Sequence, residues 1–494
     1  MVAPGAPSLL RSGALSLFTS AAPLVVALIA LPLLTRHLGT ERMGLLALAW
    51  AWLTYAALLD FGLGRTLTRL VAAADSGATL DAPLMAYVST ALVLLSVVGA
   101  AVGLLGALVA PWYVLRVLHV SPALRLDAVT SAVLFALTVP AITAASVPRA
   151  VLEARHRFRD VNLVRLPVSV GTFAIPLLLL PFTASLTVIA ITLAVVRVWA
   201  LWRYRRLAQA ELANEEPHHA ARGHLRPLLR AGAWMTVSNV LNPLLTVADR
   251  FLVGTLISVS AVALYAVPWE AVTKLFIVPG ALTMVLFPAL TGAWTSHREA
   301  LVPLHTTSVR LITLLVVPAC IVGCLLAPWL LELVGGTAYR GDSVAVLRVL
   351  AIGVAANCIA AIPFTMLQAC GRARWTATVH LCEVIPFGAL LWFGITRWGI
   401  VGAAAAWTIR AVADLTLMTA GAQLLAPLPT TSLLGTAGGV GLVTVSAWLG
   451  ASLPSTHRAP IIIAVVVMCT VPWLLWSQRT AAERLVGDRV HGQG

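Results

Sequence analysis

Apolar runs of membrane-spanning length recur along the whole chain. A bilayer core about 30 Å thick needs roughly 20 helical residues at about 1.5 Å each. The pattern therefore predicts an all-α polytopic membrane protein with about 14 transmembrane helices. The predicted helices begin near residues 14, 43, 83, 126, 161, 184, 227, 260, 304, 343, 375, 400, 431 and 459.

Composition supports this class and suggests an orientation. The chain is 60% hydrophobic and 11% charged, which is too little charge to cover a soluble protein of 494 residues. The net charge of +14 comes almost entirely from arginine between the apolar runs, so it indicates membrane topology and not nucleic-acid binding. A cytoplasmic N-terminus places about 20 arginines inside and about 9 outside, which predicts that both termini are cytoplasmic.

The longest polar stretch divides the chain into two lobes. It runs from Arg203 to His224 and is interpreted as a solvated cytoplasmic linker, with metal binding by His218, His219 and His224 as the less favoured alternative. The predicted boundaries are a six-helix lobe over 1–203, a linker over 204–225, a second six-helix lobe over 226–425, and two further helices with a cytoplasmic tail over 426–494. Duplicated six-helix bundles are common among transporters, with substrate handled where they meet.

No motif calls for a metal or a cofactor. The six cysteines lie in or beside apolar segments without paired extracellular spacing, so we expect reduced core residues.

Two charged pairs lie inside predicted helices. Ionisable groups at bilayer depth cost roughly 2.5 to 3.5 kcal/mol on insertion scales and usually face a cavity or a partner. Glu270 and Lys274, the only lysine in the chain, lie about 15 and 21 Å into the helix that begins near Ser260. Their four-residue spacing puts them on one face. Arg410 and Asp414 repeat that spacing, and for both pairs we keep two hypotheses, cavity lining and a purely structural ion pair.

Other charged residues are weaker candidates for the cavity. Charges near helix ends reach the interface cheaply, so Asp60 with Arg65, and Asp249 with Arg250, are interpreted chiefly as interfacial groups. Glu383 is an acid without an obvious local partner and is a further cavity candidate. Arg165 and Arg197 are predicted to reach the cytoplasmic interface.

Four segments follow one another along both predicted lobes. They are "LPLLTRHLGTERMGLLALA" with "LLDFGLGRTLTRLVA", "ADRFLVGTLISVSAVALYAV" with "VPGALTMVLFPAL", "LVGGTAYRGDSVAVLRVLAIG", and "LQACGRARWTATVH" with "RWGIVGAAAAW". In this order they resemble the MATE/oligosaccharide-flippase (MOP) superfamily, and specifically its polysaccharide and O-antigen-type flippases. The resemblance implies two six-helix bundles around a central cavity, with the last two helices outside. Lipid II flippases have an arginine-rich pattern in their first helix, and that pattern is missing here. The predicted first helix, "GALSLFTSAAPLVVALIALPLL", has no charged residue, and the next charge is Arg36.

The resemblance implies transfer of a polyprenyl-diphosphate-linked oligosaccharide from the inner to the outer leaflet of a bacterial cytoplasmic membrane. Expected partners are the lipid-linked saccharide, membrane lipids, a coupling proton or sodium ion, and other polysaccharide-assembly proteins. A MATE-like proton- or sodium-coupled drug antiporter is the alternative. An enzyme is disfavoured because the outer loops are short. A phosphate-binding loop needs a Gly-Lys-Ser/Thr sequence, and the only lysine, Lys274, follows Thr273, so the motif is absent.

Overall fold

The computed structural model describes residues 6–60, 62–75, 82–213, 215 and 233–452, and every regular element among them is helical. Contacts divide the chain into two compact units. Unit 1 comprises 1–267, 334–338 and 373–406, and unit 2 comprises 268–333, 339–372 and 407–494. Nine helices in the described part are long and apolar enough to cross a bilayer. The all-helical membrane class is therefore confirmed, while the number of fourteen remains a prediction.

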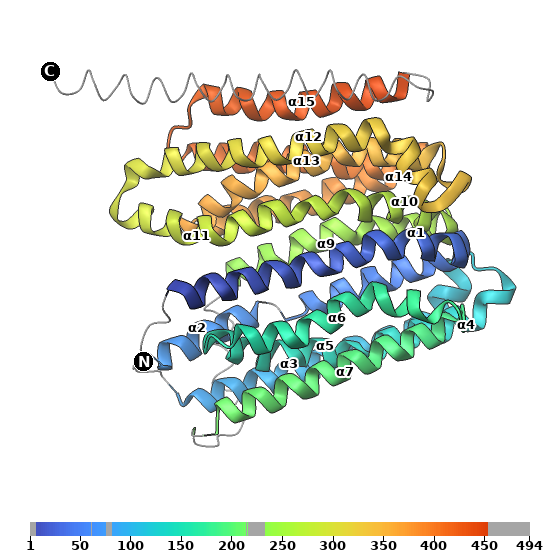
Figure 1. Cartoon of the computed structure of the whole chain (residues 1–494), viewed down its shortest axis with the longest axis horizontal. Helices are drawn as coiled ribbons and strands as arrows, with labels where there is room; N and C mark the ends of the chain where they lie inside the picture. The colour runs from blue at the N-terminus through green and yellow to red at the C-terminus, as the bar shows by residue number, and fades with distance from the viewer. Residues whose placement is uncertain (1–5, 61, 76–81, 214, 216–232, 453–494) are drawn as a thin grey trace. The chain divides into compact units, whose positions relative to one another are not determined.

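Unit 1 is built mainly from the first half of the chain. Its helices α3 to α7 run side by side, with α5 packed against both α3 and α7 (Figure 1). Leu95 of α3, Val151 of α5 and Tyr204 of α7 belong to one buried core, and the Tyr204 hydroxyl donates to the Val161 carbonyl at 3.2 Å. The helices are α1 (Ala6–Leu58), α2 (Leu63–Asp75), α3 (Leu84–Trp112), α4 (Arg125–Leu137), α5 (Val139–Ala154), α6 (Phe158–Leu179), α7 (Leu186–Glu211), α9 (Ala233–Leu256) and α10 (Val259–Thr273).

Unit 2 is organised around α13, which packs against α11 and α15. The Arg348 side chain of α13 donates from Nε to the Cys324 carbonyl of α12 at 3.1 Å. The Thr408 hydroxyl of α14 donates to the Val349 carbonyl at 2.8 Å, so the second part of α14 is held against α13. The helices are α11 (Ile277–Ser296), α12 (Leu301–Gly335), α13 (Asp342–Ala369), α14 (Ala373–Gln423) and α15 (Thr430–Ser452), with α10, α12 and α14 crossing from one unit to the other.

Two very long helices each contain a break that permits two membrane passes. At about 1.5 Å per residue, the 51 residues of α14 would extend more than twice the thickness of a bilayer core. The helical backbone is interrupted at Trp398 and Gly399, and a side chain on Gly402 would begin 1.9 Å from the Gly394 carbonyl oxygen. The chain therefore turns back sharply at this break, with Gly394 and Gly402 of unit 1 in close contact.

The first helix, α1, also contains a break at a glycine. In α1 the break falls at Gly39, whose φ of 74° favours glycine, and the chain reverses there (Figure 1). The predicted start near residue 43 corresponds to this second segment of α1.

Part of the predicted organisation lies outside the described residues. The predicted linker begins within α7, which continues to Glu211. Its residues 216–225, including His218, His219 and His224, and the helix predicted near residue 459 are not described. The lobe boundaries remain predictions.

Candidate functional site

The lone lysine forms an ion pair inside a long helix. Lys274 Nζ lies 2.7 Å from Glu270 Oε2, as the four-residue spacing predicts. Lys274 opens a 3₁₀ turn, Lys274–Phe276, between α10 and α11, six residues after Pro268, which supplies no backbone donor. The side chains are 28% and 15% exposed, so the pair belongs neither to a dry core nor to a bare surface. A mid-helix 3₁₀ turn often marks a functional hinge.

The second pair lies on the buried face of α14 within unit 2. Arg410 and Asp414 are 3% and 4% exposed, whereas Ile409 and Val412, on the other face, are exposed. Burying ionic groups among apolar helices is costly without compensating interactions. Trp407, on the same buried face, packs edge-to-face against Trp269 at 4.7 Å between ring centroids. The four-residue spacing thus correctly predicts a shared face, and its functional role stays a prediction.

Asp249 is more deeply buried than its sequence position predicts. The interfacial interpretation is wrong for this pair, because Asp249 and Arg250 are 0% and 4% exposed in unit 1. The Asp249 carboxylate accepts hydrogen bonds from the Tyr265 hydroxyl and from the Arg250 backbone N–H. These donors stabilise a charge that would otherwise be costly to bury. Phe251, next in sequence, stacks on Tyr55 with ring centroids 5.6 Å apart.

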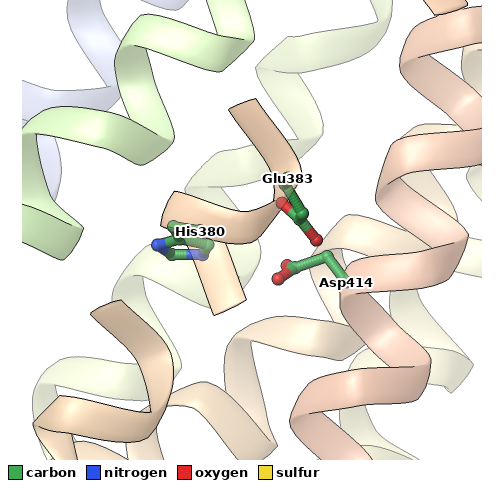
Figure 2. Close-up of side chains that lie close together, drawn as sticks. All are labelled: His380, Glu383 and Asp414. Atoms are coloured by element: carbon green, nitrogen blue, oxygen red, sulfur yellow. The ribbon is translucent and has the colours of Figure 1, made fainter. Parts of the chain in front are cut away.

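Glu383 has a neighbour that the sequence interpretation missed. Glu383 is 7% exposed and His380 is 0% exposed, and both lie on the first segment of α14 in unit 1 (Figure 2). Their three-residue spacing puts them on one helix face. Imidazole and carboxylate are both ligand types for divalent metals, although two ligands are fewer than a complete site needs. The missed signal was a histidine one turn before an acid in an apolar run. Figure 2 also draws Asp414, which belongs to unit 2.

The remaining candidates have local structural roles or differ from the prediction. Asp60 Oδ1 accepts from the Gly62 N–H at 3.0 Å in the turn between α1 and α2. The Arg65 side chain lies outside the described part of the structure. Arg165 is exposed, as predicted, but Arg197 is 8% exposed and donates to the Leu193 carbonyl at 3.1 Å. Arg197 lies in the buried stripe of α7 that packs into unit 1, so its predicted interfacial position is wrong.

Comparison with known proteins decides the family. A family model described as "Polysaccharide biosynthesis protein" matches residues 10–294, more than half of the chain. The chain belongs to the polysaccharide biosynthesis protein family. A curated protein from Shigella flexneri, named "Putative O-antigen transporter", is 29% identical to this chain over 411 residues. That alignment covers 83% of this chain and 97% of the relative.

Solved structures show the same fold. The lipid II flippase MurJ in an inward closed conformation aligns with a TM-score of 0.70 at 11% identity, covering 97% of this chain and 100% of that chain. An inward-facing multidrug resistance MATE transporter of the MOP superfamily aligns with a TM-score of 0.65 at 14% identity, covering 86% and 98%. The predicted MOP-type fold of this polysaccharide biosynthesis family member is therefore confirmed.

Proposed function

We propose that this protein is a flippase that carries a polyprenyl-diphosphate-linked oligosaccharide from the inner to the outer leaflet of the bacterial cytoplasmic membrane. The observation that carries the proposal is the alignment with the O-antigen transporter, which spans 97% of that protein. The family match over residues 10–294 supports a role in polysaccharide assembly. Both termini are cytoplasmic in this proposal, as the arginine distribution predicts.

The partly exposed Glu270–Lys274 pair suits an anionic headgroup. A diphosphate crossing an apolar slab needs compensating cations and water. Lys274 supplies a cation about 22 Å along the helical segment that begins at Val259, which is inside a bilayer core about 30 Å thick. Its partner Glu270 lowers the net attraction for phosphate, so that the headgroup is released again. The partial exposure of both side chains is consistent with contact with water.

Membrane potential is a sufficient driving force in this proposal. Each negative charge that moves from a negative inside to a positive outside gains about 2.3 kcal/mol per 100 mV. A doubly charged diphosphate gains about twice that amount, so transfer needs no ATP. Proton or sodium coupling through Glu270, Asp414 or Glu383 is the alternative source of energy.

The proposal is tested with purified protein in liposomes. A fluorescent polyprenyl-diphosphate oligosaccharide is placed in one leaflet, and its arrival in the other is followed with a membrane-impermeant glycosidase, without ATP. We expect transfer that is absent from protein-free liposomes. No transfer, together with uptake of cationic dyes driven by a proton or sodium gradient, would instead establish an antiporter.

A further inference from the structure

Unit 1 contains an apolar cavity that is separate from the charged residues described above. Its volume is about 400 Å³, and four helical elements line it: the second segment of α1, α3 with the π-turn Tyr113–Val117, α4 and α9. Each of α1, α3 and α4 presents a face at three- and four-residue spacing. On α4 this face consists of Ala128, Ser131, Ala132, Phe135 and Ala136. Protein interiors are normally close-packed, so a space of this size between three apolar faces calls for an occupant.

The hydroxyl groups of the lining are already satisfied by the protein, whereas the Trp52 indole N–H has no hydrogen-bond partner among the described residues. The Ser131 hydroxyl donates to the Ala128 carbonyl at 3.0 Å. The Tyr113 hydroxyl lies 3.0 Å from Thr255 Oγ1 and 3.4 Å from the Phe251 carbonyl, which ties the π-turn to α9. Buried water needs several polar partners, and a single indole N–H is too few for water or for a sugar. The occupant is therefore hydrocarbon and not water or sugar.

The cavity reaches the surface of unit 1 at α3. Leu105 and Val109 line it and are 63% and 43% exposed. They lie in a helix whose most apolar window is only 17% buried, as for a helix that faces acyl chains. A long hydrocarbon chain can therefore enter from the side, within the depth of the membrane.

Three arginines lie within about one helical turn of lining residues at one end of this cavity. Arg42 precedes the lining residue Leu45 by three positions on α1, and Arg125 precedes Ala128 by the same spacing on α4, which is about one helical turn. Arg116 lies in the π-turn between the lining residues Val114 and Leu118. All three belong to the end of unit 1 that carries the Gly39 turn and the loop between α3 and α4.

The acids at this end are already used by the protein. Glu41 accepts a hydrogen bond from the Ser121 N–H at 2.6 Å, and Asp127 accepts from the N-terminal residues of α7, at 2.8 Å from the Leu186 N–H. Among the described residues, no ion pair joins Arg42, Arg116 or Arg125 to an acid. We call these three residues the arginine collar. They provide positive charge near this end of the cavity for a lipid phosphate.

We propose that the cavity and the arginine collar form a binding site for an isoprenyl phosphate lipid, with its hydrocarbon chain in the cavity and its phosphate on the collar. This rests on the proposed function for the choice of an isoprenoid over an acyl chain. The alanines of the lining, Ala49, Ala110, Ala128, Ala132 and Ala136, alternate with larger residues, and this uneven surface suits regular methyl branches. Because the collar lies at the predicted outer end, the site holds the lipid carrier after transfer, before it leaves the protein.

Photolabelling of the full-length protein in phosphatidylcholine nanodiscs tests this site without transport. The probe is an isoprenyl monophosphate with a diazirine in its chain and no sugar, and labelled peptides are mapped by mass spectrometry. We expect labels within residues 45–52, 102–118 and 128–136. Ala132→Phe occupies part of the cavity, and its matched control Ala101→Phe adds the same group on an exposed position of α3 outside the lining. Labelling should fall with the first substitution and persist with the second.

The collar is tested by substitutions that leave the cavity unchanged. Arg116→Gln combined with Arg125→Gln should weaken probe binding about tenfold or more, since charge-assisted hydrogen bonds to phosphate are lost. Arg397→Gln, an exposed arginine over the Phe393 ring, is the control and should bind as wild type. The proposal is overturned if Ala132→Phe and the Arg116→Gln, Arg125→Gln double variant leave labelling unchanged. It is also overturned if phosphatidylglycerol with a diazirine acyl chain labels the same peptides equally well. Failure of leaflet transfer with the label in place would overturn the proposed function and leave the site standing.

Discussion

Among single residues, Asp249 makes the most clearly defined buried polar contact. Replacing Asp249 with alanine removes the acceptor for the Tyr265 hydroxyl and the Arg250 N–H. We expect a loss of about 1–3 kcal/mol for each buried donor left without a partner. Thermal unfolding in detergent measures this loss, and Asp249→Asn, which keeps one acceptor oxygen, should fall between alanine and wild type. Equal unfolding temperatures for all three proteins would contradict this role.

Substitutions at Glu270 and Lys274 distinguish a functional role of this ion pair from a structural one. Partly exposed ion pairs contribute about 0–1 kcal/mol, so Glu270→Gln with Lys274→Gln should change the unfolding temperature little. If Lys274 meets the diphosphate, the same double variant should transfer the lipid at least about tenfold more slowly, because a charge-assisted contact is lost. Transfer and unfolding are measured on one preparation. A large loss of stability with normal transfer would support the structural hypothesis.

Sequence reasoning located these residues but predicted their surroundings less well. Spacing alone places Glu270 with Lys274, and Arg410 with Asp414, because a helix repeats every 3.6 residues. The burial of Asp249 and Arg197 was not predictable from nearness to a helix end. Burial depends on which neighbouring helix packs there, and for Asp249 the decisive neighbour is Tyr265, sixteen residues away on another helix.

At the scale of elements, the sharp turn of α14 depends on Gly394 and Gly402, where the backbone passes so closely that no side chain fits. Gly402→Ala would place a Cβ 1.9 Å from the Gly394 carbonyl oxygen, so the two segments would have to separate. Overpacking of this kind costs about 1–3 kcal/mol. Gly388→Ala is the matched control on the same helix, since no atom lies within 4 Å of the added Cβ. Thermal unfolding should show a clear loss for the first variant only. Identical curves would argue against the tight crossing.

Hydropathy predicted most of the helices because bilayer thickness fixes their length. The predicted starts near residues 83, 260, 343 and 375 lie within two residues of α3, α10, α13 and α14. The mid-helix 3₁₀ turn at Lys274 and the division of one predicted span into α4 and α5 were not predicted. Such breaks depend on backbone hydrogen bonding around proline and not on apolar content.

For the whole molecule, the arginine distribution gives a testable topology. His119→Cys and Phe182→Cys should react with a membrane-impermeant maleimide on intact cells, in a background without the six native cysteines. Both loops belong to one end of unit 1, since the Asp127 side chain, just beyond the first loop, accepts from Ser185 at 2.8 Å, just beyond the second. Arg159→Cys should react only after permeabilisation. The reverse pattern would invert the proposed orientation.

The flippase function is tested most directly by leaflet transfer of a polyprenyl-diphosphate oligosaccharide under an imposed membrane potential. We expect ATP-independent transfer by the wild-type protein toward the positive side. Transfer should slow when an ionophore removes the potential and slow further with Glu270→Gln combined with Lys274→Gln. Purified protein that leaves the labelled lipid in its starting leaflet, at every potential and with proton or sodium gradients imposed, would contradict this function.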